Sequence, residues 1–326
     1  MRISGGIEPH HKHFRVKVAF DSYEDAESFV SDHGHDKPAW KTEGVTAAEP
    51  PNAGEVLARM RLEWQATAAL EKRRRSQSVE FPGDYAMLVF VADQHIGNAG
   101  TDYDRLFSEA DTIAKTEGMY CASLGDVFDN FIKAKLAHIR FKTRQSIPDE
   151  AVVGKEYIQA ISDKCFAWVA GNHEHWTELL TGVDYFRDLI ADACPDCLYD
   201  ADDCRVTVKV GGFEWRLRMR HDWQGGSIYN LTHAIERASR FDHDFDIGVG
   251  AHTHRSGVAR GFDNAGGSGL AVLCGSYKRL DSFSRERGFH QANPSTAVAV
   301  LLDGISGAMV GFEDLSLAAR VIGQLL

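Results

Sequence analysis

The stretch "CFAWVAGNHEHW", Cys165 to Trp176, joins an apolar run to a cluster of polar side chains. The run before Gly171 has the length and composition of a buried strand. Directly after it come an asparagine, two histidines and a glutamate, residue types that can bind a metal ion or transfer a proton. Which role each residue takes depends on whether other strands of the chain end in the same way.

Four further strand-like runs end at a side chain that can bind metal. "YAMLVFVAD" ends at Asp93, "GMYCASLGD" at Asp126, "FEWRLRMRH" at His221, and "FDIGVGAHTH" at His252 and His254. In an α/β sheet, ligands gather beyond the carboxyl ends of the strands. We therefore expect these side chains to meet in space.

Helical stretches separate several of these runs, for example residues 102–115 and 227–239. The alternation of strands and helices predicts an α/β fold. Later strand-like runs, residues 269–277, 295–303 and 307–315, follow with few helices between them. They predict a second, more antiparallel sheet.

The composition is that of a globular protein with a core. The chain has 326 residues, of which 44% are hydrophobic and 25% charged. The formal net charge of −11 argues against a basic coat for nucleic acid, although local basic patches stay open. Apolar runs are too short to cross a membrane, and the N-terminus does not read as a signal peptide, so we expect a cytoplasmic protein that does not bind membranes.

Residues 1–80 are predicted to form a separate, more polar extension, and residues 81–326 the main domain. In the extension, a helix is predicted to start at Asn52, because Leu57, Met60 and Trp64 recur at helical spacing. We interpret this apolar stripe as a packing face.

The strand ends form five motifs in a fixed order. They are Asp93-Gln-His95, Gly125-Asp126-Val-Phe-Asp129, Gly171-Asn172-His173-Glu174, His221 and Ala251-His252-Thr-His254. One such motif is common by chance, but five in order, each after an apolar strand, are not. The set resembles the calcineurin-like metallophosphoesterase superfamily, whose pattern is D-x-H, G-D-x-x-D, G-N-H-[D/E], H, G-H-x-H, over about residues 85–280. Ala251 stands where the family usually has glycine, and His221 is matched by order and strand-end position alone.

This resemblance implies the fold and the metal ligands. The implied fold is a four-layer α/β/β/α sandwich with two central mixed sheets. Two divalent ions would clamp the attacking and leaving oxygens of a phosphate ester. Asp126 would bridge them, with one ion held by Asp93, His95 and His254 and the other by Asn172, His221 and His252. Manganese is the expected ion, with iron, zinc and nickel as alternatives.

The resemblance also implies a general acid. His173 would face the substrate and protonate the leaving oxygen after in-line attack by a metal-bridging hydroxide. Asp129 would hold its imidazole and favour the charged form. Glu174 is expected to support the loop, and His175 to be structural or to lie at the rim.

Three basic residues near the motifs are candidates for substrate contacts, namely Arg255, Lys278 and Arg140. Arg140 belongs to a basic cluster after the second motif, for which a solvated helix face is an equal alternative. Cys194 and Cys197, with Cys204 nearby, could hold a structural zinc ion, but we expect a reduced loop without metal.

The leading hypothesis is a metal-dependent hydrolase that cleaves phosphodiester bonds of nucleic acid (DNA or RNA) or nucleotides. Asn130 and Glu174 make the motifs similar to the repair-exonuclease branch, because the protein-phosphatase branch usually has arginine and aspartate there. Later segments look like phosphoesterases of bacteriophages. A phosphomonoesterase and a non-catalytic binding scaffold are the alternatives, and the sequence leaves the oligomeric state open.

Overall fold

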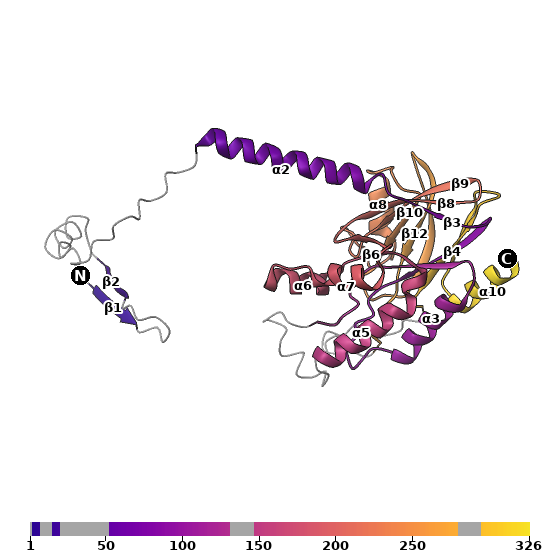
Figure 1. Cartoon of the computed structure of the whole chain (residues 1–326), viewed down its shortest axis with the longest axis horizontal. Coiled ribbons are helices and arrows are strands. Elements are labelled where there is room, and N and C mark those ends of the chain that lie inside the picture. The colour runs from indigo at the N-terminus through magenta and orange to yellow at the C-terminus, as the bar shows by residue number, and fades with distance from the viewer. Residues whose placement is uncertain (1, 7–14, 20–51, 131–146, 280–294) are drawn as a thin grey trace. The chain divides into compact units, whose positions relative to one another are not determined.

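The computed structural model describes residues 2–6, 15–19, 52–130, 147–279 and 295–326 (Figure 1). The chain forms two compact units, residues 1–64 and 65–326. In the first unit, β1 (Arg2–Gly6) pairs with β2 (Arg15–Ala19) in an antiparallel ribbon. The boundary at residue 80 stays a prediction.

Helix α2 (Ala53–Arg74) begins in the first unit and ends in the second. It starts where predicted, and the Asn52 side chain accepts a hydrogen bond from the amide of Gly54 at 2.7 Å. The predicted packing face is wrong for the described residues, since Leu57, Met60 and Trp64 are 48%, 57% and 71% exposed. Helical spacing identified the stripe but could not show whether a partner covers it.

The first six-stranded sheet carries three of the five predicted strand-end motifs. Its strands β4, β5, β6 and β7 run parallel, and β13 and β14 continue the sheet antiparallel beyond β4. The order is β14 (Met309–Phe312), β13 (Val298–Asp303), β4 (Tyr85–Val91), β5 (Met119–Ser123), β6 (Cys165–Val169) and β7 (Leu198–Asp200).

The second six-stranded sheet carries the other two motifs. Strand β10 runs parallel to both β9 and β12, while β11 and β8 pair antiparallel with β12 and β9. The order is β11 (Val258–Asn264), β12 (Gly267–Leu273), β10 (Ile247–Gly250), β9 (Phe213–Met219), β8 (Cys204–Val210) and β3 (Ser78–Phe81).

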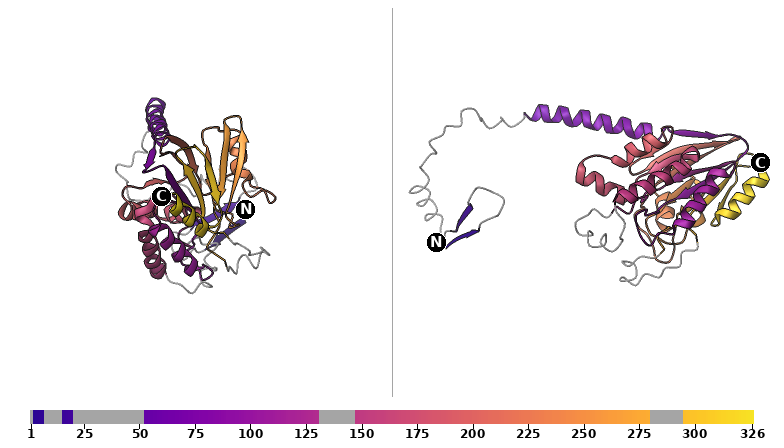
Figure 2. Two further views of the ribbon diagram at one scale, coloured as in Figure 1. Left: turned by 90° about the vertical axis from the view of Figure 1, so that its right-hand side faces the viewer. Right: turned by 60° about the horizontal axis from the view of Figure 1, so that its bottom comes forward.

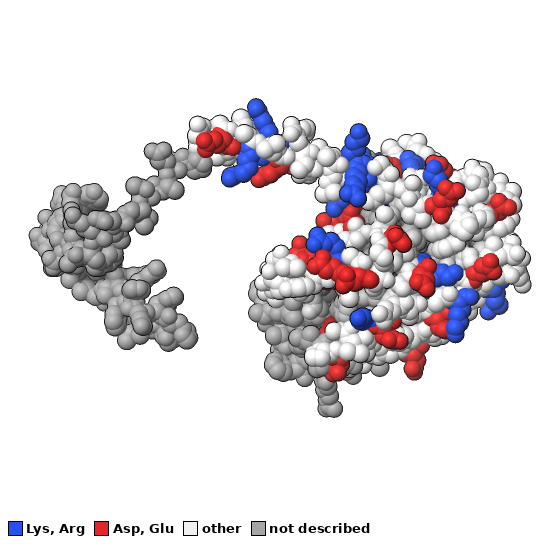
Figure 3. All heavy atoms as spheres, viewed as in Figure 1, with Lys and Arg blue, Asp and Glu red and all other residues white. Residues whose placement is uncertain are grey.

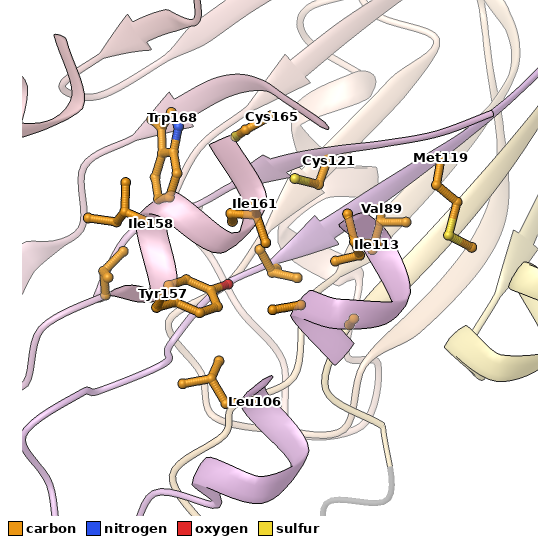
Figure 4. Close-up of a cluster of buried hydrophobic side chains, with 14 of the residues drawn as sticks. Val89, Leu106, Ile113, Met119, Cys121, Tyr157, Ile158, Ile161, Cys165 and Trp168 are labelled. Carbon is orange, nitrogen blue, oxygen red and sulfur yellow. The ribbon is translucent and has the colours of Figure 1, made fainter. Parts of the chain in front are cut away.

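Helices cover the outer face of the first sheet, as Figures 1 and 2 show for α3, α5 and α10. Their apolar sides pack on the strands in a cluster that includes Leu106, Tyr157 and Trp168 (Figure 4). Asp102 caps α3 by accepting a hydrogen bond from the amide of Arg105. The helices are α3 (Tyr103–Lys115), α5 (Ile147–Ile161), the 3-10 turn Ser162–Lys164, α6 (Asn172–Thr181), α7 (Tyr185–Ala193) and α10 (Leu315–Leu325).

Two more apolar clusters complete the layers. One lies between the sheets and includes Phe90, Val169 and Leu217. The other joins Ile235 of helix α8 (His233–Ser239) to Phe245 and the outer face of the second sheet. The predicted four-layer α/β/β/α sandwich with two mixed sheets is therefore confirmed.

Two local predictions are wrong. The runs at 295–303 and 307–315 join the first sheet as β13 and β14, because β13 pairs with β4 across more than 200 residues of sequence. The helix expected over 227–239 forms only from His233, since Asn230 and Thr232 make a hydrogen-bonded turn before it. Local patterns do not reveal such long-range pairing.

Candidate metal centre

The predicted ligands all lie just beyond the carboxyl ends of strands. Asp93 and His95 follow β4, Asp126 follows β5, and Asn172 follows β6 in the first sheet. His221 follows β9, and His252 and His254 follow β10 in the second sheet. These strands lie in the middle of their sheets, so the ligand loops converge where the layers meet.

The backbone at these loops adopts a conformation that side chains rarely tolerate. In the described part of the chain, every non-glycine residue with positive φ lies at this site. Left-handed backbone costs energy and is retained where surrounding structure enforces it, often at functional sites. The residues are Asp93 (51°), His95 (46°), Asp126 (53°), Asn130 (37°), His252 (69°) and His254 (51°).

The first group of donors consists of Asp93, His95, Asp126 and His254. Their ligand atoms lie within 4.8 Å of one another. The Nε2 atoms of His95 and His254 are 2.9 Å apart, and His254 Nε2 is 3.4 Å from Asp93 Oδ1. His95 Nε2 lies 3.9 Å from Asp126 Oδ2.

The second group consists of Asp126, His221 and His252. His221 Nε2 lies 3.3 Å from Asp126 Oδ2, 3.2 Å from His252 Nδ1 and 3.2 Å from the Asn172 side-chain oxygen. The structure thus brings together all seven predicted ligands, and Asp126 belongs to both groups.

The donors are held in place by their other atoms. The backbone amide of His173 donates to Asp126 Oδ1, and the amide of His252 donates to Asp93 Oδ2, both at 2.9 Å. His221 Nδ1 donates to the Leu124 carbonyl at 2.5 Å, which leaves Nε2 as the ring nitrogen that faces the other donors. Asp93 Oδ1 is buried without a hydrogen bond among the described residues. Imidazole lone pairs and carboxylates converging in this way fit a pair of divalent cations.

The electrostatics follow from burial and close opposite charges. Burial opposes ionisation of Asp126, but His221, His173 and His95 hold its pKa well below its usual range. Burial also opposes the charged form of His221 and so lowers its pKa. The carboxylates of Asp126 and Asp93 outweigh burial and raise the pKa of His221 to about 10. Burial lowers the pKa of His95 well below its usual value. The metal-free site thus pairs Asp126 with a charged His221 ring.

Glu174 holds the loop of the shared ligand, as predicted. Its Oε2 accepts hydrogen bonds from the amides of Asp126 and Gly171, both at 2.8 Å. Its Oε1 accepts from the amides of Val127 and Phe128 at 2.9 and 3.2 Å. Burial and the nearby Asp126 raise the pKa of Glu174 to about 7, against these four donors. A Cβ on Gly171 would collide with the Asp126 amide and carboxylate, so only glycine fits there.

His173 is buried beside the shared carboxylate. Its Nε2 lies 3.7 Å from Asp126 Oδ2, and its Nδ1 contacts the Asp129 main-chain carbonyl at 2.5 Å. The Trp176 ring stacks on it with centroids 4.0 Å apart. Burial lowers the pKa of His173, although Asp126 and Asp129 act in the opposite direction. Sequence reasoning missed Trp176, whose spacing of three residues on a helix could have revealed it.

Asp129 lies beside His173, as predicted, and also beside His95. Its main-chain carbonyl contacts His173 Nδ1, and its carboxylate lies within 4.8 Å of ring nitrogens of both His173 and His95. The carboxylate also contacts Asn98 and Lys278. Burial raises the pKa of Asp129 despite the nearby Lys278. Asp129 in turn acts to raise the pKa of His173 against burial, while its role in holding the imidazole stays a prediction.

The predicted substrate contacts have different surroundings. Lys278 lies inside the site, with its side chain 4% exposed. Arg255 follows His254 and donates to the carbonyls of Ser227 and Ile228. Arg140 lies outside the described residues. Asn130, which sequence reasoning did not place, donates to the His173 carbonyl and to Thr177.

Other polar candidates stand apart from this centre. His175 contacts Glu178 and the Ala201 carbonyl, in keeping with a structural role. Cys194 and Cys197 form a disulfide, so the expected reduced loop is wrong, and Cys204 is free and buried. Within the described ranges, no cluster of metal-capable side chains includes a cysteine.

No protein-family model matches the chain, and no curated protein matches it. Solved structures similar to it include vacuolar protein sorting 29 from Cryptosporidium parvum, with 17% identity, 71% of this chain and 99% of that chain covered, and a TM-score of 0.35. Another is the calcineurin-like phosphoesterase YfkN from Bacillus subtilis, with 12% identity, 74% of this chain and 97% of that chain covered, and a TM-score of 0.37. A third is nuclease MPE from Pseudomonas putida, with 14% identity, 69% of this chain and 87% of that chain covered, and a TM-score of 0.31.

In the order of its motifs and in its layers, the chain resembles calcineurin-like phosphoesterases. The repair-exonuclease branch and the bacteriophage type stay predictions. Among the described helices, none is long and apolar enough to cross a membrane.

Proposed function

We propose that this chain is a binuclear metal-dependent phosphoesterase that hydrolyses phosphodiester bonds. The observation that carries the proposal is the convergence of six donor side chains from two sheets around Asp126, with the His173 imidazole beside the same carboxylate.

The residues divide the work of the reaction. Asp93, His95 and His254 would hold one ion, Asn172, His221 and His252 the other, and Asp126 both. When bound, two divalent ions supply a nucleophile at neutral pH and positive charge at the phosphoryl group. The neutral amide of Asn172 avoids adding negative charge where an anionic substrate must approach.

His173 is the proposed general acid. Its Nδ1 faces a carbonyl oxygen, which can only accept, so this nitrogen carries a proton and donates it. Nε2 is then the atom that gains and releases the catalytic proton. The leaving oxygen would take this proton from Nε2, and the Trp176 ring would keep the imidazole oriented during the transfer.

The substrate we propose is a phosphodiester of nucleic acid or a nucleotide. A diester carries one negative charge per phosphate, whereas a monoester carries up to two. The residue after Asp129 is the neutral Asn130, whose amide is already bonded to His173 and Thr177. It therefore offers no positive charge for the second negative charge of a monoester. On the face in Figure 3, basic and acidic side chains of the described residues are intermixed, which favours phosphate binding by the charge of the centre itself over binding by a basic patch on this face.

Turnover of matched esters tests the proposal. With added Mn²⁺, we expect hydrolysis of bis(p-nitrophenyl) phosphate and single-stranded DNA to exceed that of p-nitrophenyl phosphate. His173→Ala should lower kcat by about 10²–10⁴-fold and leave bound metal unchanged, because an acid and not a ligand is lost. His175→Ala, two residues further on, is the matched control and should turn over normally.

Three outcomes would contradict it. Turnover of the monoester alone would favour the phosphomonoesterase. Absence of both metal and Mn²⁺-dependent turnover would favour the non-catalytic scaffold. Loss of metal in His173→Ala would move His173 from acid to ligand.

A further inference from the structure

The two ring nitrogens of His95 face different groups. Nε2 points to the other ligands of the first group, 2.9 Å from His254 Nε2 and 3.8 Å from Asp93 Oδ1. Nδ1 lies on the other side of the ring, 3.1 Å from Asp129 Oδ1. Neither Nδ1 nor this Oδ1 has a hydrogen bond to any other described atom, and both are buried. Each is therefore the available partner of the other, and a small turn of the imidazole would complete the bond.

The Asp129 carboxylate is itself held from two sides. Oδ2 accepts a hydrogen bond from Asn98 Nδ2 at 2.9 Å, and Asn98 in turn accepts one from the amide of Gly100. Oδ1 lies 3.5 Å from the ammonium of Lys278, a side chain that is 4% exposed. A buried carboxylate with a fixed donor and a fixed cation has little freedom to turn away from His95.

The Lys278 segment is also tied to a ligand loop. The Lys278 amide donates to Ser276 Oγ, and the Ser276 hydroxyl donates to the Asp93 carbonyl. The amide of Tyr277 donates to the same carbonyl at 3.1 Å. The cation beside Asp129 is thus fixed to the loop that carries Asp93 and His95.

His173 is held by groups other than this carboxylate as well. Its Nδ1 is bonded to the main-chain carbonyl of Asp129, which any residue would provide, and Trp176 stacks on its ring. The main chain of Asp129 therefore contacts the proposed acid directly, while the carboxylate lies near both His173 and the predicted metal ligand His95.

We propose that the Asp129 carboxylate is a positioning residue for His95. It would accept the Nδ1–H of His95 and so present the Nε2 lone pair to the cation held with Asp93 and His254. Carboxylates that accept from a ligating imidazole fix its tautomer and raise its basicity, and their loss costs about 10–100-fold in metal affinity. The inference rests on the proposed metal centre and adds a role toward His95 to the role predicted for Asp129 beside the acid.

Removing the carboxylate separates a role toward His95 from a role toward His173 alone. A partner of His173 would affect turnover and leave metal affinity as it is in His173→Ala. A positioning residue for His95 would weaken one of the two ions, the one held with Asp93 and His254. Metal affinity of the protein without substrate separates them.

The experiment is calorimetric titration of the metal-free full chain with Mn²⁺. We expect two ions in the wild type, and in Asp129→Asn one of them bound about 10–100-fold more weakly. His173→Ala should titrate like the wild type. Asp111→Asn is the matched control, because it also removes a carboxylate paired with a lysine, Lys115, on an exposed helix face.

A second variant guards against misfolding of Asp129→Asn, which thermal unfolding of the metal-free protein would reveal. Asn98→Ala leaves the Asp129 charge in place but removes the hydrogen bond to Oδ2, and should weaken the same ion by a smaller factor. Wild-type affinity for both ions in both variants would overturn the inference and leave the proposed function standing. A wild-type chain that binds no Mn²⁺ would overturn both.

Discussion

Replacing Glu174 with glutamine tests how the loop of the shared ligand is held. The glutamate accepts four backbone hydrogen bonds, two on each oxygen. In Glu174→Gln, one oxygen becomes an amide nitrogen, so two buried N–H groups face a donor. At about 1–3 kcal/mol for each buried donor left without an acceptor, the loss is about 2–6 kcal/mol.

This loss should appear as a lower melting temperature. For a domain of this size, each kcal/mol shifts Tm by about 2–4 °C, so we expect a fall of roughly 5–20 °C in the metal-free protein. Mn²⁺ should restore less stability than in the wild type, because the Asp126 loop is no longer fixed in its left-handed conformation.

Thermal unfolding followed by circular dichroism, with and without Mn²⁺, measures both effects. Glu178→Gln is the control, since Glu178 lies on the same helix and is exposed, and its carboxylate contacts the His175 ring. The reasoning would be refuted if Glu174→Gln melted within about 2 °C of the wild type, as a surface substitution would.

Three further predictions concern the bridge, the packing beneath it and the pH dependence. Asp126→Asn should weaken both ions together in a Mn²⁺ titration; two tightly held ions would argue against a bridge. Gly171→Ala should lower both Tm and Mn²⁺ affinity, because its Cβ would press on Asp126; an unchanged melt would show that the loop can move aside. Burial opposes ionisation of Asp203, but Arg218, Arg205 and Arg220 hold the pKa of this carboxyl below its usual value. Its contribution should therefore be complete above about pH 4 and be lost as pH falls through the lower folded pKa. The stability difference between wild type and Asp203→Asn should be constant from pH 5 to 7 and shrink below pH 4; a constant difference down to pH 3 would contradict this.

The sequence contained enough to predict the layers and the convergence of the candidate ligands. Five apolar runs that end at metal-capable side chains are a local signal, and the sheet gathers them because parallel strands share an edge. The motif resemblance then separated Asn172 from His173, which spacing alone does not do. Glu174 was placed correctly in outline, but its four amide partners depend on two loops that are 45 residues or more apart in sequence.

What sequence could not decide was which atom of a residue faces which neighbour. Asp129 was placed beside His173, where it lies, but its direct contact with His173 Nδ1 is through its main-chain carbonyl, and its carboxylate contacts His95 as well. No spacing rule specifies which of these atoms faces which neighbour. Likewise, the pairing of β13 with β4 depends on chain closure over long range.

The measurement that tests the central claim most directly is anomalous diffraction from crystals grown with Mn²⁺. The account predicts two manganese peaks about 3.5–4 Å apart. Both should contact Asp126, with His95 and His254 at one and His221 and His252 at the other. A single peak away from these side chains, or two peaks without Asp126 between them, would contradict it.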